Sequence, residues 1–434
     1  MEAPLSIPEP APGAETAPAE TPGRLWNRNF TLLWLGQTIS NLGNPAFHIG
    51  AMFWLMEKTG SASLMGLLMT VSMIPGVLLG PFGGTFADRH SRVRIMIWAD
   101  VISGMAGLAF ATAVWLRPDD TALIIPLLFV LSVGVGIVRA FFAPAASSLV
   151  PDLVPRDKLA AANSLSQFSV QVSMVSGQAL GGILYKIFGP VLLFFFDAVS
   201  FLFAGVCALF IPRDRTGERP VVRTDVHPVR QFLAETADGF RYFWSRTGLR
   251  DFTVVACVIN FLSTPGLVLF PFYVDLYLKA GPQWYGFLMA AVSVGVIFGF
   301  LLAGSLRLEG KGRATAILTA MLLYPVFFGS LALWRAPIPA LIAVFLGGVT
   351  TGIINVYLNT MVQAATPTEL RGRVMGFLGT LSGGLMPLGM ALGGFVGDLT
   401  GKNVPLILTV CAVLALLATV LLGFRRACRE FLAS

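Results

Sequence analysis

Three charged residues, Asp100, Arg139 and Asp197, lie inside long apolar segments, where a charge is costly and usually serves a function. A carboxyl group in such a place can carry a proton if both sides reach it in turn and its pKa suits proton release. Asp100 and Arg139 are expected at similar depths, which predicts an ion pair with a structural or gating role. Asp197, in FFFDAVSF, has no obvious mate. It is predicted to carry the proton; the alternative is a protonated acid hydrogen-bonded to a neighbour.

The composition indicates which elements must hold these residues. The chain of 434 residues is 55% hydrophobic and 12% charged, with a mean hydropathy of +0.76, whereas soluble domains are about 25% charged. Such a chain cannot hide its apolar surface in one water-soluble core and belongs in a lipid bilayer. Apolar runs of the ~20 residues needed to cross a bilayer can be marked off twelve times.

A long polar segment divides these runs six and six. The sequence therefore predicts an all-α membrane protein with twelve transmembrane helices in two pseudo-symmetric six-helix halves. The predicted parts are a disordered cytoplasmic tail at 1–29, an N-terminal half at 30–211, a cytoplasmic linker at 212–251, a C-terminal half at 252–424 and a cytoplasmic tail at 425–434.

Positive charges are distributed unevenly between the predicted loops. With the N-terminus placed inside, the inner segments hold 23 of the 30 Lys and Arg residues and the outer loops hold six. The positive-inside rule then predicts that both termini are cytoplasmic. The same asymmetry accounts for the net charge of +7 without a nucleic acid partner.

Two motifs recur along the chain. GQALGG at 177–182 returns as GMALGG at 389–394, an offset of 212, and RNFTLL at 28–33 returns as RDFTVV at 250–255, an offset of 222. Such offsets indicate an internal duplication, which in membrane carriers places a binding site between the halves. The motif glycines are predicted to pack helices closely. They are Gly177, Gly181, Gly182, Gly389, Gly393 and Gly394.

The stretch GPFGGTFADRHSR at 80–92 passes abruptly from apolar to charged residues. Its glycines, Gly80, Gly83 and Gly84, are predicted to let another helix approach. Asp88 could accept hydrogen bonds from a neighbouring helix N-terminus and so clamp the inner face shut. A plain positive-inside turn is the alternative. The predicted cytoplasmic gate comprises Gly84, Asp88, Arg89, Arg92, Asp100 and Arg139.

GGTFADRHSRVR at 83–94 resembles motif A of the major facilitator superfamily, which maps its glycine, acid and arginines onto Gly84, Asp88, Arg89 and Arg92. The stretches NRNFTLLWLGQTISNLGN and PDLVPRDKLAAANSL and the paired GxALGG motifs resemble its macrolide-efflux and enterobactin-exporter branch. GQALGG also resembles the antiporter motif of the fifth span, with Gln178 in place of proline. The resemblance implies the superfamily fold, export and a place in the bacterial inner membrane.

Polar side chains form stripes on three of the predicted helices, in the first, fifth and tenth spans, and the stripe of the fifth comprises Ser164, Gln167, Gln171 and Gln178. A stripe either bonds helix to helix or lines a wet cavity. The resemblance implies a cavity lined by spans one, four, seven and ten. The candidate cavity residues are Gln37, Asn41, Asn44, His48, Asn260, Thr351, Asn355 and Asn359.

The predicted function is secondary transport by alternating access: proton-coupled export of amphipathic organic compounds of drug, macrolide or siderophore type. A nutrient importer or lysolipid flippase on the same fold is the alternative, and a non-transporting membrane receptor is a further one.

Enzymatic activity is not expected, because no paired catalytic constellation is visible. With three histidines scattered along the chain, no metal or cofactor is expected either. The expected partners are the small-molecule substrate, protons and the lipid bilayer, and the protein is expected to be monomeric.

Overall fold

The computed structural model describes residues 25–212, 237, 240–241, 243–306, 308–423 and 425–433. The predicted tail at 1–29 and the predicted linker at 212–251 lie largely outside this described part. The helices of the described chain, in order, are α1 (Arg28–Thr59), α2 (Ala62–Arg89), α3 (Arg92–Leu116), α4 (Thr121–Leu153), α5 (Leu159–Leu209), α7 (Thr247–Phe272), α8 (Pro282–Leu306), α9 (Gly310–Ser330), α10 (Pro337–Ala365), α11 (Thr368–Leu399), α12 (Val404–Ala418) and α13 (Arg426–Ala433).

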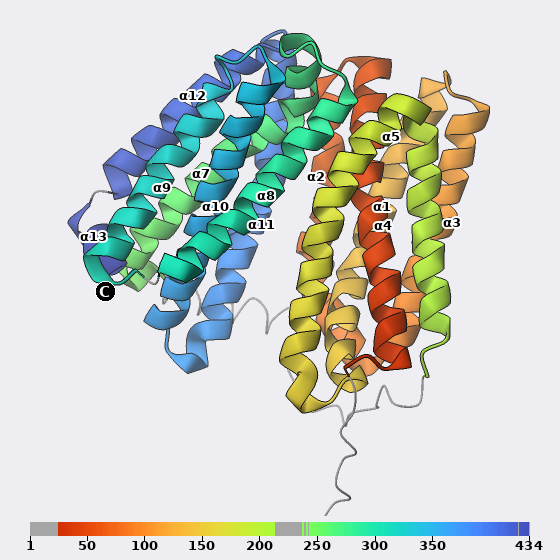
Figure 1. Ribbon diagram of the computed structural model, residues 1–434, viewed down its shortest axis with the longest axis horizontal. Coiled ribbons are helices and arrows are strands. Elements are labelled where there is room, and N and C mark those ends of the chain that lie inside the picture. The colour runs from red at the N-terminus through yellow and green to blue at the C-terminus, as the bar shows by residue number, and fades with distance from the viewer. Residues whose placement is uncertain are drawn as a thin grey trace, which may run out of the picture.

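The long helix α5 is two helical segments joined by a turn. Gly189 has φ 72° and ψ −173°, a backbone conformation that glycine adopts without steric cost, and Pro190 follows it. The chain reverses there, so that the segments 159–188 and 190–209 run in opposite directions (Figure 1). By length and composition, ten helical stretches of the described chain could cross a membrane, and Arg156–Leu209 counts as one of them. Helix α1, which carries the predicted polar stripe, is not among the ten.

The helices form two bundles, α1–α5 and α7–α12, which meet at one end and diverge toward the other (Figure 1). One hydrophobic cluster joins both bundles where they meet, and it includes Met65 of α2 and Met390 of α11. At the other end the clusters are separate: one is built around Phe30 of the first bundle and another around Phe252 of the second. We call the joined end the closed end and the other, which carries the first turns of α3 and α7, the open end.

The glycines of the repeated GxALGG motif lie at equivalent helix crossings. The first two of each motif pack within one bundle, against α1 beside Pro45 or against α7 beside Pro265. An added Cβ on the second would stand 3.0 Å from Ala46 Cα in one bundle and 2.5 Å from Pro265 Cα in the other. These four glycines are Gly177, Gly181, Gly389 and Gly393.

The last glycine of each motif packs across the closed end onto the opposite bundle. A Cβ on Gly182 would stand 2.8 Å from the Pro282 carbonyl oxygen at the start of α8. A Cβ on Gly394 would stand 3.1 Å from Ser63 Cα at the start of α2. No side chain fits at either place, and the matching contacts give the repeated motif a common structural role.

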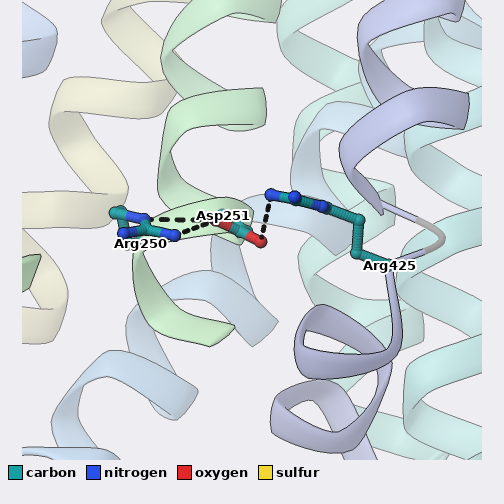
Figure 2. Close-up of polar contacts among 3 residues, drawn as sticks. All are labelled: Arg250, Asp251 and Arg425. Atoms are coloured by element: carbon teal, nitrogen blue, oxygen red, sulfur yellow. Dashed lines mark hydrogen bonds and ion pairs between the residues drawn. The ribbon is translucent and has the colours of Figure 1, made fainter. Parts of the chain in front are cut away.

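The C-terminal segment predicted as a tail forms a docked helix in its described part. Helix α13 packs on α7 and α9, with Cys428 fully buried, and burial raises the pKa of that thiol to about 11. Asp251, near the start of α7, lies between two arginines (Figure 2). Its Oδ1 accepts from Arg250 at 3.2 Å and its Oδ2 from Arg425 at 3.2 Å, which ties the chain before α13 to the second bundle.

Candidate functional site

A cavity of about 280 Å³ lies within the first bundle. Side chains of α1, α2, α3, α4 and the second segment of α5 line it, and Met390 reaches it from α11 of the other bundle. Phenylalanines and methionines form much of its wall. Its polar and charged lining residues are Asn44, His48, Ser72, Ser103, Ser132, Arg139 and Asp197.

Asp197 shares this cavity with Arg139, but no ion pair within 4.0 Å joins the two side chains in the described structure. Only 7% of Asp197 is exposed, and its Oδ1 has no hydrogen-bond partner in the described structure. Helix α1 closes over it at Gly43, where an added Cβ would stand 2.8 Å from Oδ1. A buried carboxyl group and a guanidinium group therefore line the same cavity.

The predicted ion pair between Asp100 and Arg139 does not form: in the described structure no Arg139 nitrogen lies within 4.0 Å of an Asp100 carboxylate oxygen. Asp100 is buried against the second segment of α5, where an added Cβ on Gly205 would stand 3.4 Å from Asp100 Cβ. Arg139 faces the cavity instead. The directions of the two side chains around their helix axes were not readable from the sequence.

The predicted polar stripe of α1 reaches the cavity only in part. Asn44 and His48 line it, whereas Gln37 and Asn41 do not and are half-buried. The Asn44 Nδ2 donates to the Ser40 carbonyl within α1 at 3.0 Å.

The predicted polar residues of the second bundle line none of the described cavities. Asn355 and Asn359 are exposed and donate to carbonyls one turn earlier in α10, at 3.0 Å and 2.8 Å. Thr351 likewise donates to its own helix, and Asn260 of α7 is exposed. None of the four makes a described hydrogen bond to another helix, which favours a wet surface over helix-to-helix bonding.

The predicted gate loop lies at the open end. Arg92 donates to the Ser148 carbonyl at 2.8 Å and pairs with Asp152 at 2.5 Å, both in α4 of the same bundle. Arg89 is exposed, and the Asp88 side chain lies outside what the structure describes. The described contacts of this loop therefore remain within the first bundle.

The glycines before this loop do not share one packing role. A Cβ on Gly83 would overlap the Ala140 carbonyl of α4, so this glycine sets a close helix crossing. A Cβ on Gly80 or Gly84 would meet no atom within 4 Å, which corrects the prediction that both serve close packing. All three lie on α2, but only Gly83 faces α4.

A contact that sequence reasoning missed joins the bundles at the closed end. Asp398, in the last turn of α11, accepts hydrogen bonds from the Ala62 and Ser63 amides and from the Ser61 hydroxyl, each at 2.9 Å. A carboxylate at a helix N-terminus satisfies free amides and complements the helix dipole. In the sequence, Asp398 stood out only as an acid at the outer end of a predicted helix. It lies 336 residues after Ala62, whose amide it accepts from at the start of α2.

Gln178, which replaces the proline of the antiporter motif, also joins the bundles. Its Oε1 accepts from the Ser293 hydroxyl of α8 at 3.1 Å. The Gln178 carbonyl lies so close to Gly286 that no side chain fits there. The departure from the motif thus adds a polar contact between α5 and α8.

Residues 21–433 match the family described as transmembrane secretion effector. The chain belongs to this family, of the major facilitator superfamily. The chain is 24% identical to macrolide efflux protein A of Streptococcus pyogenes, over 87% of this chain and 91% of that protein. It is also 24% identical to the multidrug efflux pump Tap of Mycobacterium tuberculosis, over 87% of this chain and 89% of that one.

Solved structures share the fold. A bacterial homologue of the iron transporter ferroportin, in an inward-facing state, matches with a TM-score of 0.70 at 16% identity, over 92% of this chain and 99% of that one. The nucleoside transporter NupG matches with a TM-score of 0.73 at 11% identity, over 92% and 100%. The chain is thus a multi-pass membrane protein of a transporter family, and its family and structural neighbours are transporters rather than enzymes.

Proposed function

We propose that this protein exports amphipathic organic compounds across a bacterial inner membrane by alternating access. One observation carries the proposal: in the described part of the chain the hydrophobic cluster shared by the bundles lies at one end, and beside it lies a cavity containing both a buried acid and an arginine. A transporter needs such an arrangement, because its binding site must open to one side at a time. The efflux relatives support export as the direction.

The proposed topology has twelve crossings in two six-helix halves. The ten apolar stretches, the added crossing of α1 and the division of α5 at Gly189 together support this number. We place the open end and both termini in the cytoplasm, because basic residues predominate in the segments at that end. Cysteine labelling in intact cells tests the orientation: an impermeant reagent should modify a cysteine at Asp119 but not one at Arg156. Labelling at Arg156 but not at Asp119 would show that the proposed orientation is wrong.

The proposed substrate class follows from the chemistry of the cavity and of the surfaces beside it. Phe47, Met69 and Met73 supply apolar walls, and the amides and hydroxyls supply a few orienting groups. The exposed amides of α7 and α10 would face the same substrate from the other half. A compact ion or a sugar would need a denser set of polar groups, so a bulky amphipathic compound fits better.

The proposed gate at the cytoplasmic face consists of Gly84, Asp88, Arg89 and Arg92. In the present conformation this face is open, and Arg92 is held on α4. When the face closes, Asp88 would cap a helix of the second half, as Asp398 caps α2 at the opposite face. Asp100 and Arg139 would support the gate from within the first half.

For coupling, we propose that Asp197 carries the proton and that Arg139 competes with that proton for the carboxylate. A cation close to an acid favours its ionised form, and burial favours its neutral form. A small movement of Arg139 would therefore switch the Asp197 carboxyl group between the two forms. Proton uptake and bundle movement would thereby be linked.

Transport in proteoliposomes with an imposed pH gradient tests both parts. Wild-type protein should accumulate members of a panel of amphipathic compounds when the gradient is present. Asp197→Asn should abolish gradient-driven accumulation but keep substrate counterflow, whereas Asp157→Asn, which changes an exposed acid outside the cavity, should keep both. Indifference of the wild type to the gradient would remove proton coupling, and transport of sugars or lysolipids alone would contradict the substrate class.

A further inference from the structure

A second cavity, of about 390 Å³, lies on the outside of the first bundle near the open end. It is a groove between α3 and α4, bounded by the end of α2. Its apolar wall is accessible: Trp98 is 65% exposed, Ile102 51% and Ile137 40%. The groove has no side chain in common with the cavity that contains Asp197.

The groove is apolar along most of its length and polar at its open-end limit. Arg94, His90 and Ser91 lie at that limit. From Arg94 to Ile102 the wall extends along α3 for about 12 Å, at ~1.5 Å per residue. This length fits within one leaflet, since the whole hydrocarbon core is about 30 Å thick.

The polar groups at this limit have unused bonding capacity. The Ser91 hydroxyl is buried and has no hydrogen-bond partner in the described structure. Arg94 is exposed and makes no described ion pair or hydrogen bond, although Arg92, two residues earlier, is held by Asp152. The His90 ring stacks on Phe86, with 4.0 Å between ring centroids, and is thereby held at the mouth of the groove.

We propose that this groove binds one anionic glycerophospholipid of the cytoplasmic leaflet. Its phosphate would take the free donors of Arg94 and Ser91, and one acyl chain would lie along Trp98 and Ile102. A free anion would leave the apolar wall uncovered, and a zwitterionic lipid such as phosphatidylcholine would bring its own cation close to the arginine. Basic pockets between helices on the cytoplasmic side suit anionic headgroups. The site is separate from the transport cavity and does not depend on what the protein carries.

Native mass spectrometry of the purified full chain tests this site. The probes are phosphatidylglycerol and phosphatidylcholine with identical acyl chains. Wild-type protein should retain one phosphatidylglycerol in preference to phosphatidylcholine. Arg94→Gln should lower that preference about fivefold, the factor equivalent to about 1 kcal/mol per basic residue at a membrane surface. Arg94→Lys should largely restore it, and Arg156→Gln, an exposed arginine at the same end, should leave it unchanged.

Crosslinking locates the acyl chain independently. Phosphatidylglycerol with a photoreactive acyl group, in nanodiscs, should label the peptides that contain Trp98 and Ile137. The proposal is overturned if Arg94→Gln and wild type retain the lipid equally, if both lipids bind equally well, or if the labels lie on other helices. Displacement of the lipid by millimolar inorganic phosphate would also overturn it, because a free anion would then suffice.

Discussion

Asp398→Ala should release the closed end. In the structure this carboxylate accepts three hydrogen bonds from the first turn of α2, at 2.9 Å each, and it is the acid that joins the two bundles there. The contact can exist only while the bundles touch at this end. Its removal therefore destabilises one conformation of the transport cycle and leaves the other unchanged, which shifts the population between them.

The size of the shift follows from the bonds lost. Removing a helix N-cap costs about 1 kcal/mol, and a carboxylate at a helix N-terminus adds about 0.3–1 kcal/mol more. Hydrogen bonds to a charged group are worth about 1.5–3 kcal/mol each, but they are not additive and water replaces part of them at this half-exposed position. We therefore expect the conformation with the closed end joined to lose about 2–3 kcal/mol of stabilisation. At about 1.4 kcal/mol per factor of ten, this loss changes the equilibrium between the two conformations 30- to 150-fold.

Accessibility of the cavity measures this change. Met73 lines the cavity, so Met73→Cys in a background without the native cysteines should react slowly with an impermeant thiol reagent added at the closed end. Asp398→Ala should raise that rate by up to the factor above. Asp119→Ala is the matched control, because Asp119 pairs with Lys58 within one bundle, at 2.6 Å. A rate within twofold of the parent, or an equal rise in the control, would refute the reasoning.

Two further predictions concern packing. Gly83→Ala should lower the thermal unfolding midpoint in detergent, because its Cβ would overlap the α4 backbone, at a cost of about 1–3 kcal/mol. Gly84→Ala, which meets open space, should keep the midpoint of the parent, and equal midpoints for both variants would contradict the crossing described. Asp251→Ala should leave Arg250 and Arg425 facing each other without their shared acid and so loosen α13, detected as faster C-terminal proteolysis. Unchanged proteolysis would show that apolar packing alone holds α13.

Much of the fold was readable from the sequence because its signals are local or repeated. Apolar runs of membrane length indicate helices wherever they occur, since an unpaired backbone cannot lie in lipid. The repeated GxALGG motif predicted close helix contacts, and the structure places the glycines of both copies at equivalent crossings. Asn44 and His48 were identified as cavity candidates by their spacing on one face of α1, which is a property of the helix itself.

The pairings between helices were decided only by the tertiary structure. A residue's position along its helix can be counted from the sequence, but the direction of its side chain toward a neighbour depends on how the helices are rotated and packed. Arg139 therefore lines the cavity that contains Asp197 and forms no described ion pair with Asp100. For the same reason Asp398, 336 residues from the amide that it caps, could not be matched to α2 before the two bundles were placed together.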